Sequence, residues 1–563
     1  MNFTPQISPL GPLWLSAIVG LLPLATIFVT LGWLRWKAHW AGLTAVAVAI
    51  IVAVFAWQMP FTLALLSATQ GAVFGIFPIM WIVFTAIALY QITVVSGRFE
   101  DLRGVFALVS DDPRVQAMLI AFCFGGLLEA LAGFGAPVAI TGVMLMAIGF
   151  SALRAAIVVL VANTAPVAFG AIAIPIITAG NLTKIPYQQI GAYVGHQTPL
   201  LAAFVPLILV YLADGKRGFK QLWPVALATG LAFAIAQWVS ATWLSVELTD
   251  IIASLVGLAV AVVFMRFWKP EGAAEALATL HADRDAELAG MTDKERAALP
   301  ELHDDVDHTH LNGSRIFMAL FPYLLVIAVF SVTKLIEPVK VWMASTDIKI
   351  KWPGLDGHIL TASGQPSGST IYNFQWLSSP GTSLLISLVI VAIVYQVSAG
   401  KVLNELWKTL YKLRYSILTV ASVLALAYVM NLSGQTITIG TWIAGTGAAF
   451  AFFSPILGWI GTAVTGSDTS ANALFATLQQ TAGVKAGIDP TLLVAANTSG
   501  GVVGKMISPQ NLTIAATAVG LLGRESDILR KVLWWSLGML AVLCLLVGLQ
   551  STPVLSWMLP VFE

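Results

Sequence analysis

Residues 162–175 read ANTAPVAFGAIAIP, and residues 496–509 read ANTSGGVVGKMISP. Both stretches open with Ala-Asn-Thr, and a glycine and a proline then follow at equal offsets: Gly170 and Pro175 in the first, Gly504 and Pro509 in the second. An earlier pair of glycines, Gly133 and Gly466, precedes the two stretches at nearly equal distances. Small residues are common in apolar helices, so chance similarity is the alternative, but the spacing favours an internal repeat.

The composition indicates that this repeat lies in a membrane. Of the 563 residues, 58% are hydrophobic and 10% are charged, whereas soluble proteins carry about 25% charged residues. Apolar runs of about 17–25 residues, long enough to span a bilayer, recur along the chain. The net charge of +1 suggests neither a nucleic acid nor an acidic partner. We therefore expect an all-α polytopic protein in the lipid bilayer of a cell membrane, inserted without a cleavable signal peptide.

Two apolar stretches are too long for one crossing. Residues 115–150 are interrupted by GFGAP at 133–137, and residues 440–484 by TGSDTS at 465–470. Lys and Arg favour the cytoplasmic side of a membrane. They cluster in the following loops: Arg35 and Lys37; Arg98, Arg103 and Arg114; Lys216, Arg217 and Lys220; Lys401, Lys408, Lys412 and Arg414; Arg524, Arg530 and Lys531. These loops share one side only if each long stretch is a re-entrant hairpin, whereas a true span in place of either would put whole basic loops outside.

This pattern predicts about twelve crossings, with both termini outside and two hairpins of opposite orientation. Broken helices over 152–178 and 490–518, which contain Asn, Pro and Gly, follow the hairpins and run in opposite directions. The two membrane halves, 1–267 and 315–563, therefore form an inverted repeat with discontinuous helices. Secondary transporters have this architecture.

Two segments lie outside the repeat. Residues 268–314 are rich in charge and predict a solvated, disordered cytoplasmic linker, although HDDVDHTH at 303–310 could be drawn as a metal site. Residues 336–378 are expected to form an external loop. Within it, DIKIKW at 347–352 and TIYNFQW at 370–376 alternate in polarity, which predicts a small β-hairpin.

Breaks in membrane helices indicate a cavity, because backbone in hydrocarbon must satisfy its own hydrogen bonds. A break also exposes N–H groups at a new helix N-terminus, where the helix dipole favours an anion. We expect a substrate site that suits a carboxylate. The hydroxyl and amide side chains available to complete it are Asn163, Thr164, Asn497, Thr498, Ser499, Thr469 and Ser470.

Charged residues deep in the apolar segments are the candidates for coupling: Glu129, Asp468 and Lys505. Each is costly to insert into a bilayer, so each is a functional candidate. We expect Lys505 to attract the substrate carboxylate and Glu129 or Asp468 to carry a proton. The structural alternative is an ion pair between Asp468 and Lys505, which would leave Glu129 as the better proton carrier. His196 is more typical of helix packing than of a proton relay.

Four motifs carry a family resemblance: FGGLLEALAGFGAPVAITG (124–142), ANTAPVAFGAIAIP (162–175), TAVTGSDTSANALF (462–475) and AANTSGGVVGKMISPQN (495–511). With these motifs the chain resembles the L-lactate permease family of bacterial proton-coupled 2-hydroxymonocarboxylate carriers, which includes glycolate permeases. The resemblance implies uptake of both lactate enantiomers and of glycolate, by proton symport, across the bacterial inner membrane.

Other functions remain open from the residues alone. Asn-Thr pairs and free carbonyls at a broken helix also suit a sodium-coupled carrier of a related carboxylate, and a passive channel is a further alternative. A haem enzyme would need paired histidines in its spans, and a metalloprotease would need HExxH; the sequence contains neither. We therefore expect no catalytic residues, no metal and no cofactor, and the sequence leaves the oligomeric state open.

Overall fold

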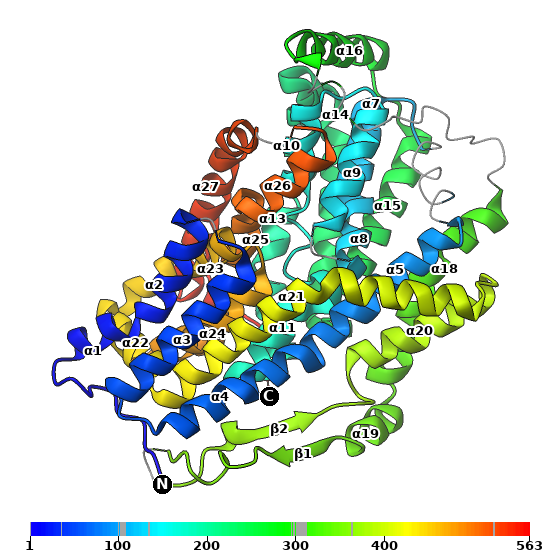
Figure 1. The fold of residues 1–563 in the computed structure, drawn as a ribbon. Helices are drawn as coiled ribbons and strands as arrows, with labels where there is room; N and C mark the ends of the chain where they lie inside the picture. Colours follow the sequence, from blue (N-terminus) through cyan, green and yellow to red (C-terminus); the bar gives the residue numbers. More distant parts are fainter. Residues whose placement is uncertain are drawn as a thin grey trace.

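A computed structural model describes residues 2–34, 36–98, 101, 109–132, 135–293, 296, 299, 312–361, 364–521 and 524–562. In this part the chain is mostly helical (Figure 1). The first half contains α1 (Leu13–Gly20), α2 (Leu22–Phe28), α3 (Ala38–Phe55), α4 (Phe61–Phe74), α5 (Trp81–Val95), α7 (Pro113–Met118), α8 (Gly125–Ala132), α9 (Ala136–Ala147), α10 (Ala152–Ala162), α11 (Gly170–Thr183), α12 (Tyr187–Val194), α13 (Thr198–Ala202), α14 (Val205–Val239) and α15 (Thr249–Phe267). The rest contains α16 (Ala273–Ala289), α18 (Gly313–Phe330), α19 (Glu337–Ser345), β1 (Ile348–Lys351), β2 (Ile371–Phe374), α20 (Pro380–Val394), α21 (Ala399–Ser433), α22 (Gln435–Ile443), α23 (Phe450–Thr465), α24 (Asp468–Ala486), α25 (Pro490–Gly504), α26 (Pro509–Ala518) and α27 (Glu525–Gln550).

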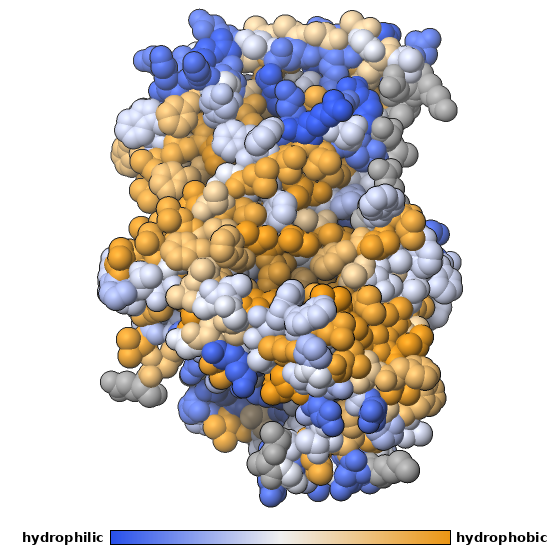
Figure 2. All heavy atoms as spheres, turned by 90° about the vertical axis from the view of Figure 1, so that its left-hand side faces the viewer, coloured by the Kyte–Doolittle hydropathy of each residue, from blue (hydrophilic) through white to orange (hydrophobic). Residues whose placement is uncertain are grey.

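The surface of the molecule matches a bilayer. Within the described residues, 10 helices are long and apolar enough to cross a membrane, and shorter apolar helices accompany them. Hydrophobic side chains gather around the middle of the face in Figure 2, and hydrophilic ones gather toward its two ends. Phe55 and Phe267, each at the end of an apolar helix, are 81% and 87% exposed, as lipid-facing residues would be. The all-α multi-pass fold is therefore confirmed, while the number of crossings stays a prediction.

Both over-long apolar stretches fold as helical hairpins. In the first, the π-helical turn at Leu119–Phe124 leads into α8, and α9 packs back against both. In the second, α23 and α24 pack against each other. Gly135 and Gly466 stand at the two tips with φ of +84° and +76°, in the left-handed region that glycine adopts without cost. Gly133, which the sequence places at the first tip, lies outside the described residues.

The two stretches that open with Ala-Asn-Thr each contain a break. Residues 163–169 separate α10 from α11, and α11 opens with Ala171–Ala173 in a left-handed turn. In the second copy α25 passes into a 3-10 turn at Lys505–Ile507, and α26 starts afresh at Pro509, capped by Ser508. Left-handed non-glycine residues cost roughly 1–2 kcal/mol each, so packing around the first break has to hold it in place.

The contacts between the copies follow the inverted repeat. The second segment of the first broken helix, α11, packs on α24, the second arm of the second hairpin. Correspondingly α26, the second segment of the second broken helix, packs on α9, the second arm of the first hairpin. Each broken helix therefore reaches across to the other hairpin.

The segments outside the repeat lie at opposite ends of the molecule (Figure 1). β1 and β2 pair antiparallel, with Ile348 opposite Phe374, which confirms the expected β-hairpin. The expectation that the whole linker is disordered is wrong for 273–289, which form α16. Glu287 on this helix accepts hydrogen bonds from the N–H groups of Ala152 and Leu153 and so caps α10. HDDVDHTH at 303–310 lies outside the described residues.

Candidate functional site

A buried ion pair joins the first hairpin to the second helix break. Lys505 Nζ lies 2.5 Å from Glu129 Oε1, and Asn163 Nδ2 donates to Glu129 Oε2 at 2.9 Å. The three residues are 7%, 3% and 5% exposed. Glu129 comes from α8, Asn163 from the first break and Lys505 from the second. The arrangement therefore ties both helix breaks to one carboxylate on the first hairpin.

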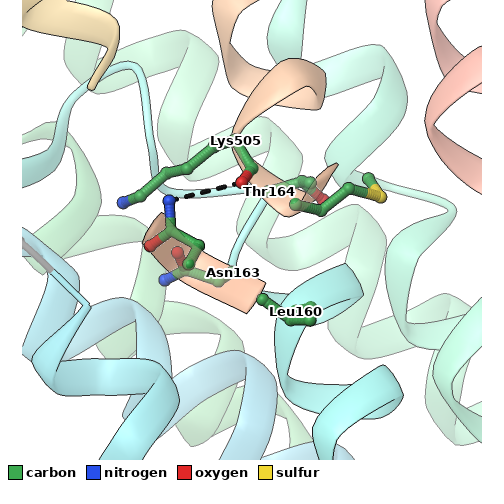
Figure 3. A pocket seen from close by; sticks show the side chains of 6 residues that line it. Leu160, Asn163, Thr164 and Lys505 are labelled. Carbon is green, nitrogen blue, oxygen red and sulfur yellow. Dashed lines mark hydrogen bonds between the residues drawn. The ribbon is translucent and has the colours of Figure 1, made fainter. Parts of the chain in front are cut away.

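A small pocket lies beside this pair, and in this structure it is too narrow to hold a water molecule. Figure 3 shows Asn163, Thr164, Leu160 and Lys505 around it. Asn511, from the first turn of α26, is also in its lining and donates to the backbone oxygens of Lys505 and Gly466, each at 3.3 Å. Of the side chains expected to bind substrate, Asn163, Thr164 and Lys505 thus line one pocket between the two helix breaks.

Asp468 stands on the other hairpin. Its Oδ1 accepts a long hydrogen bond of 3.4 Å from Thr462, while Oδ2 has no hydrogen-bond partner among the described residues. Gly501 makes room for it, because a Cβ at that position would lie 1.9 Å from Asp468 Oδ1. Lys505 is near enough to interact with Asp468 electrostatically, but its salt bridge is with Glu129. The alternative of an Asp468–Lys505 ion pair is therefore wrong.

Two neighbouring hydroxyls, Thr469 and Ser470, lie in the first turn of α24 and are 6% and 3% exposed. Ser467 caps this helix by accepting from the Ser470 N–H at 3.4 Å. The two residues therefore sit at the tip of the second hairpin, next to Asp468 along the chain, and neither lines the pocket beside Lys505.

Asn497, Thr498 and Ser499 belong to a buried network between α24 and α25. Asn497 Nδ2 donates to Asn472 Oδ1 at 2.9 Å, and Asn472 Nδ2 donates to Thr498 Oγ1 at 2.9 Å. Ser499 Oγ donates to Gln197 Oε1 at 2.6 Å. All of these side chains are fully buried. Their polar groups are paired with other buried side chains, and none of the three lines the pocket beside Lys505.

Several residues of this region were missed by sequence reasoning. Asn472 lies inside the SDTSAN motif, and Asn511 lies just after the second copy of the repeat, so their positions were the available signal. Asp250 is fully buried at the start of α15, where Gln237 Nε2 donates to its Oδ1 at 3.0 Å. A charged residue at the end of an apolar segment is normally interpreted as lying at the membrane–water interface. The sequence therefore did not indicate Asp250 as a site residue.

His196 accepts a hydrogen bond from Trp238 Nε1 at its Nε2 and contacts the Ala192 carbonyl with Nδ1, at 2.9 and 2.7 Å. Both ring nitrogens are therefore occupied by helix-packing contacts. No group of three potential metal ligands occurs among the residues that the structure describes.

An apolar belt, two inverted hairpins and two broken helices around a buried ion pair define a multi-pass membrane transporter of the inverted-repeat class. Comparison with known proteins is more specific. Residues 16–554 match the L-lactate permease family. The chain belongs to this family, and the resemblance noted in its motifs is confirmed.

Relatives match over nearly the whole length. The chain is 42% identical to an L-lactate permease of Bacillus subtilis (strain 168), over 100% of both chains. It is 40% identical to the glycolate permease GlcA of Escherichia coli (strain K12), over 98% of both chains, and 38% identical to an L-lactate permease of the same strain, over 100% of both. The crystal structure of the Alcanivorax borkumensis YdaH transporter aligns over 78% of this chain and 85% of its own at 13% identity, with a TM-score of 0.29, too low to add to the argument.

Proposed function

We propose that this chain takes up L-lactate, D-lactate and glycolate across the bacterial inner membrane by proton symport. The observation that carries the proposal is the buried Glu129–Lys505 pair, which lies beside a pocket between two helix breaks. The names of its full-length relatives, lactate and glycolate permeases, support the substrate class.

Lysine and amide groups suit recognition of a 2-hydroxy acid. The substrate carboxylate pairs with Lys505, and Asn163 and Thr164 offer an amide and a hydroxyl to the substrate hydroxyl. In this proposal the site is completed by buried polar groups on α24 and α25, namely Asn497, Thr498, Ser499, Thr469 and Ser470. A site that hydrogen-bonds a substrate hydroxyl discriminates against analogues that lack it, because its own polar groups would otherwise be left unpaired.

Coupling follows from a change of partner at Lys505. A carboxylate that takes Lys505 leaves Glu129 buried without its cation, and an unpaired buried carboxylate favours the protonated form. One proton on Glu129 cancels the charge of one lactate, which an inside-negative potential otherwise opposes by about 2.3 kcal/mol per 100 mV. Substrate and proton therefore bind together. Asp468, whose Oδ2 has no hydrogen-bond partner in the described structure, is the second candidate carrier.

Labelled lactate uptake into proteoliposomes with an imposed pH gradient tests the proposal. Wild-type protein should accumulate lactate, and unlabelled glycolate should compete whereas succinate should not. Glu129→Gln, which resembles the protonated state, should still exchange lactate at equal pH. Its accumulation ratio should fall about tenfold for each unit of pH gradient, because one proton fewer is moved.

Glu337→Gln is the matched control, because Glu337 is exposed on α19 and pairs only with Lys340 among the described residues. This variant should accumulate lactate as the wild type does. Unchanged accumulation by Glu129→Gln would exclude Glu129 from coupling and leave Asp468 as the carrier. Accumulation driven by a sodium gradient at constant pH would contradict proton symport.

A further inference from the structure

Asp250 is a third acid buried in the membrane region, besides Glu129 and Asp468. It is fully buried at the start of α15, and no Lys, Arg or His of the described structure lies within salt-bridge distance. Among the described residues its side chain has one hydrogen bond, from Gln237 Nε2, which also donates to the carbonyl of Ala165 in the first helix break at 3.1 Å. Asp250 is therefore tied, through one amide, to the broken helix beside the substrate pocket.

Three buried oxygens in this place have no hydrogen-bond partner in the described structure: Asp250 Oδ2, Gln237 Oε1 and Ser254 Oγ. Ser254 lies one helical turn after Asp250 and faces α8, since a Cβ on Gly126 would lie 2.4 Å from its Oγ. Buried polar atoms are nearly always paired in folded proteins. A proton bound between these groups would give Asp250 Oδ2 and Gln237 Oε1 a hydrogen-bond partner.

We propose that Asp250, with Gln237, binds a second transported proton. This inference rests on the proposed function, because it concerns the same uptake cycle. A proton on Oδ2 turns the carboxylate into a donor, and Gln237 Oε1 belongs to the amide whose nitrogen already donates to Oδ1. Amide and carboxylic acid groups pair in this two-bond fashion, so a single proton removes both the unpaired charge and two unpaired oxygens.

The surroundings of Asp250 bear on its titration. Glu129 on α8 is close enough to interact with it electrostatically. α14 contributes the neutral Gln237, the turn at Leu119–Phe124 contributes Cys123, which faces Gly257 of α15, and the turn at Ser240–Leu244 contributes no titratable group. No neighbour therefore supplies a compensating cation.

Glu247, three residues before Asp250, lines a cleft of about 400 Å³, together with residues of α19 and Phe562 near the C-terminus. Glu247 accepts hydrogen bonds from Tyr187 and Ser245. In this proposal the second proton enters from this cleft and passes from Glu247 to Asp250.

A second proton changes the net charge that crosses the membrane in each transport cycle. One monocarboxylate with one proton is neutral, whereas one monocarboxylate with two protons carries a net charge of +1. Uptake would then be driven by an inside-negative potential even without a pH gradient. At equilibrium about 60 mV should accumulate lactate about tenfold.

The test uses full-length protein in proteoliposomes with a potassium diffusion potential at equal pH. Wild type should accumulate lactate about tenfold at roughly −60 mV, and about a hundredfold for one pH unit at zero potential. Asp250→Asn, close in shape to the protonated acid, should exchange lactate normally, show no response to potential and accumulate about tenfold per pH unit. Asp250→Glu should retain the response, and Asp285→Asn at an exposed position of α16 should behave as wild type.

Each other result overturns the proposal. A wild type that ignores the potential and accumulates about tenfold per pH unit moves a single proton, so the proposed function stands and the second site falls. A potential response that persists in Asp250→Asn assigns the charge to another residue. Accumulation driven by sodium at constant pH and zero potential, and lost in Asp250→Asn, makes this a sodium site. Absence of any lactate uptake by the wild type removes the proposed function itself.

Discussion

Corresponding residues of the repeat have different tasks in the two halves. Asn163 and Asn497 each follow an alanine and precede a threonine. Asn163 donates to Glu129 at the pocket, whereas the Asn497 amide is engaged by Asn472 and the Ala471 carbonyl. The difference arises because the first Asn lies at a break and the second lies within α25. Residues that are identical in the two copies of the repeat therefore have different roles.

Replacement of each asparagine should reveal this division. Asn163→Ala should weaken lactate binding by about 0.5–1.5 kcal/mol, up to about tenfold in Kd, because one hydrogen bond at the pocket is lost. Asn497→Ala should chiefly lower the melting temperature, because it removes the buried hydrogen bonds from the Asn497 amide to Asn472 and to the Ala471 carbonyl. Isothermal titration and thermal unfolding in detergent measure the two effects. Ser331→Ala, distant from the repeat, is the control; equal lactate affinity in Asn163→Ala and this control would contradict the assignment.

Glycines set the distance between elements. α23 and α25 approach so closely that a Cβ on Gly500 would lie 1.9 Å from the carbonyl oxygen of Pro455, and one on Gly458 would lie 1.8 Å from that of Asn497. Small residues allow this approach between membrane helices. The hairpin is thereby pressed against the broken helix, which places Asp468 near Lys505.

A single methyl group should separate these helices. Gly500→Ala should destabilise the protein by about 1–3 kcal/mol, because backbone on both sides has to shift. It should also impair transport, since the second break moves with α25. Gly538→Ala on α27 is the matched control, because a Cβ there would meet no atom within 4 Å. Thermal unfolding in detergent and lactate exchange measure the outcome, and equal stability of the two variants would show that the close approach is not needed.

At the scale of the whole molecule, the hairpins decide the topology. The N-terminus pairs with the loop that carries the β-hairpin, through Phe3 and Ile359, and Phe562 lines the same cleft as residues of α19. Both termini therefore lie at the end opposite to α16 (Figure 1). This arrangement agrees with a single side for the basic loops and the opposite side for both termini.

Labelling in intact cells tests the orientation. A cysteine at Lys184, which follows the first broken helix, should react with a membrane-impermeant thiol reagent from outside. A cysteine at Asn404, in the basic start of α21, should react only after the cells are opened. Labelling of position 404 from outside would overturn the inverted arrangement.

Local sequence patterns predicted much of the fold of this protein. The apolar runs, the excess of Lys and Arg in some loops, the two Ala-Asn-Thr stretches and the alternating strands predicted the membrane fold, the hairpins, the broken helices and the β1–β2 pair. These features depend on neighbours in the chain, or on the bilayer, which every apolar segment meets alike. The same patterns located the family and the charged residues of the site.

Only the tertiary structure decided which charged residues form ion pairs with each other. Lys505 is four residues along α25 from Gly501, whose neighbour is Asp468, yet it bonds to Glu129, 376 residues away. The many charged residues of α16 predict disorder, but Glu287 on this helix accepts hydrogen bonds from the free N–H groups of α10. The lack of a salt-bridge partner for Asp250 among the described residues could likewise not be predicted from the sequence. Whether a buried charge is paired depends on which distant segment packs against it, and the sequence contains no local record of that choice.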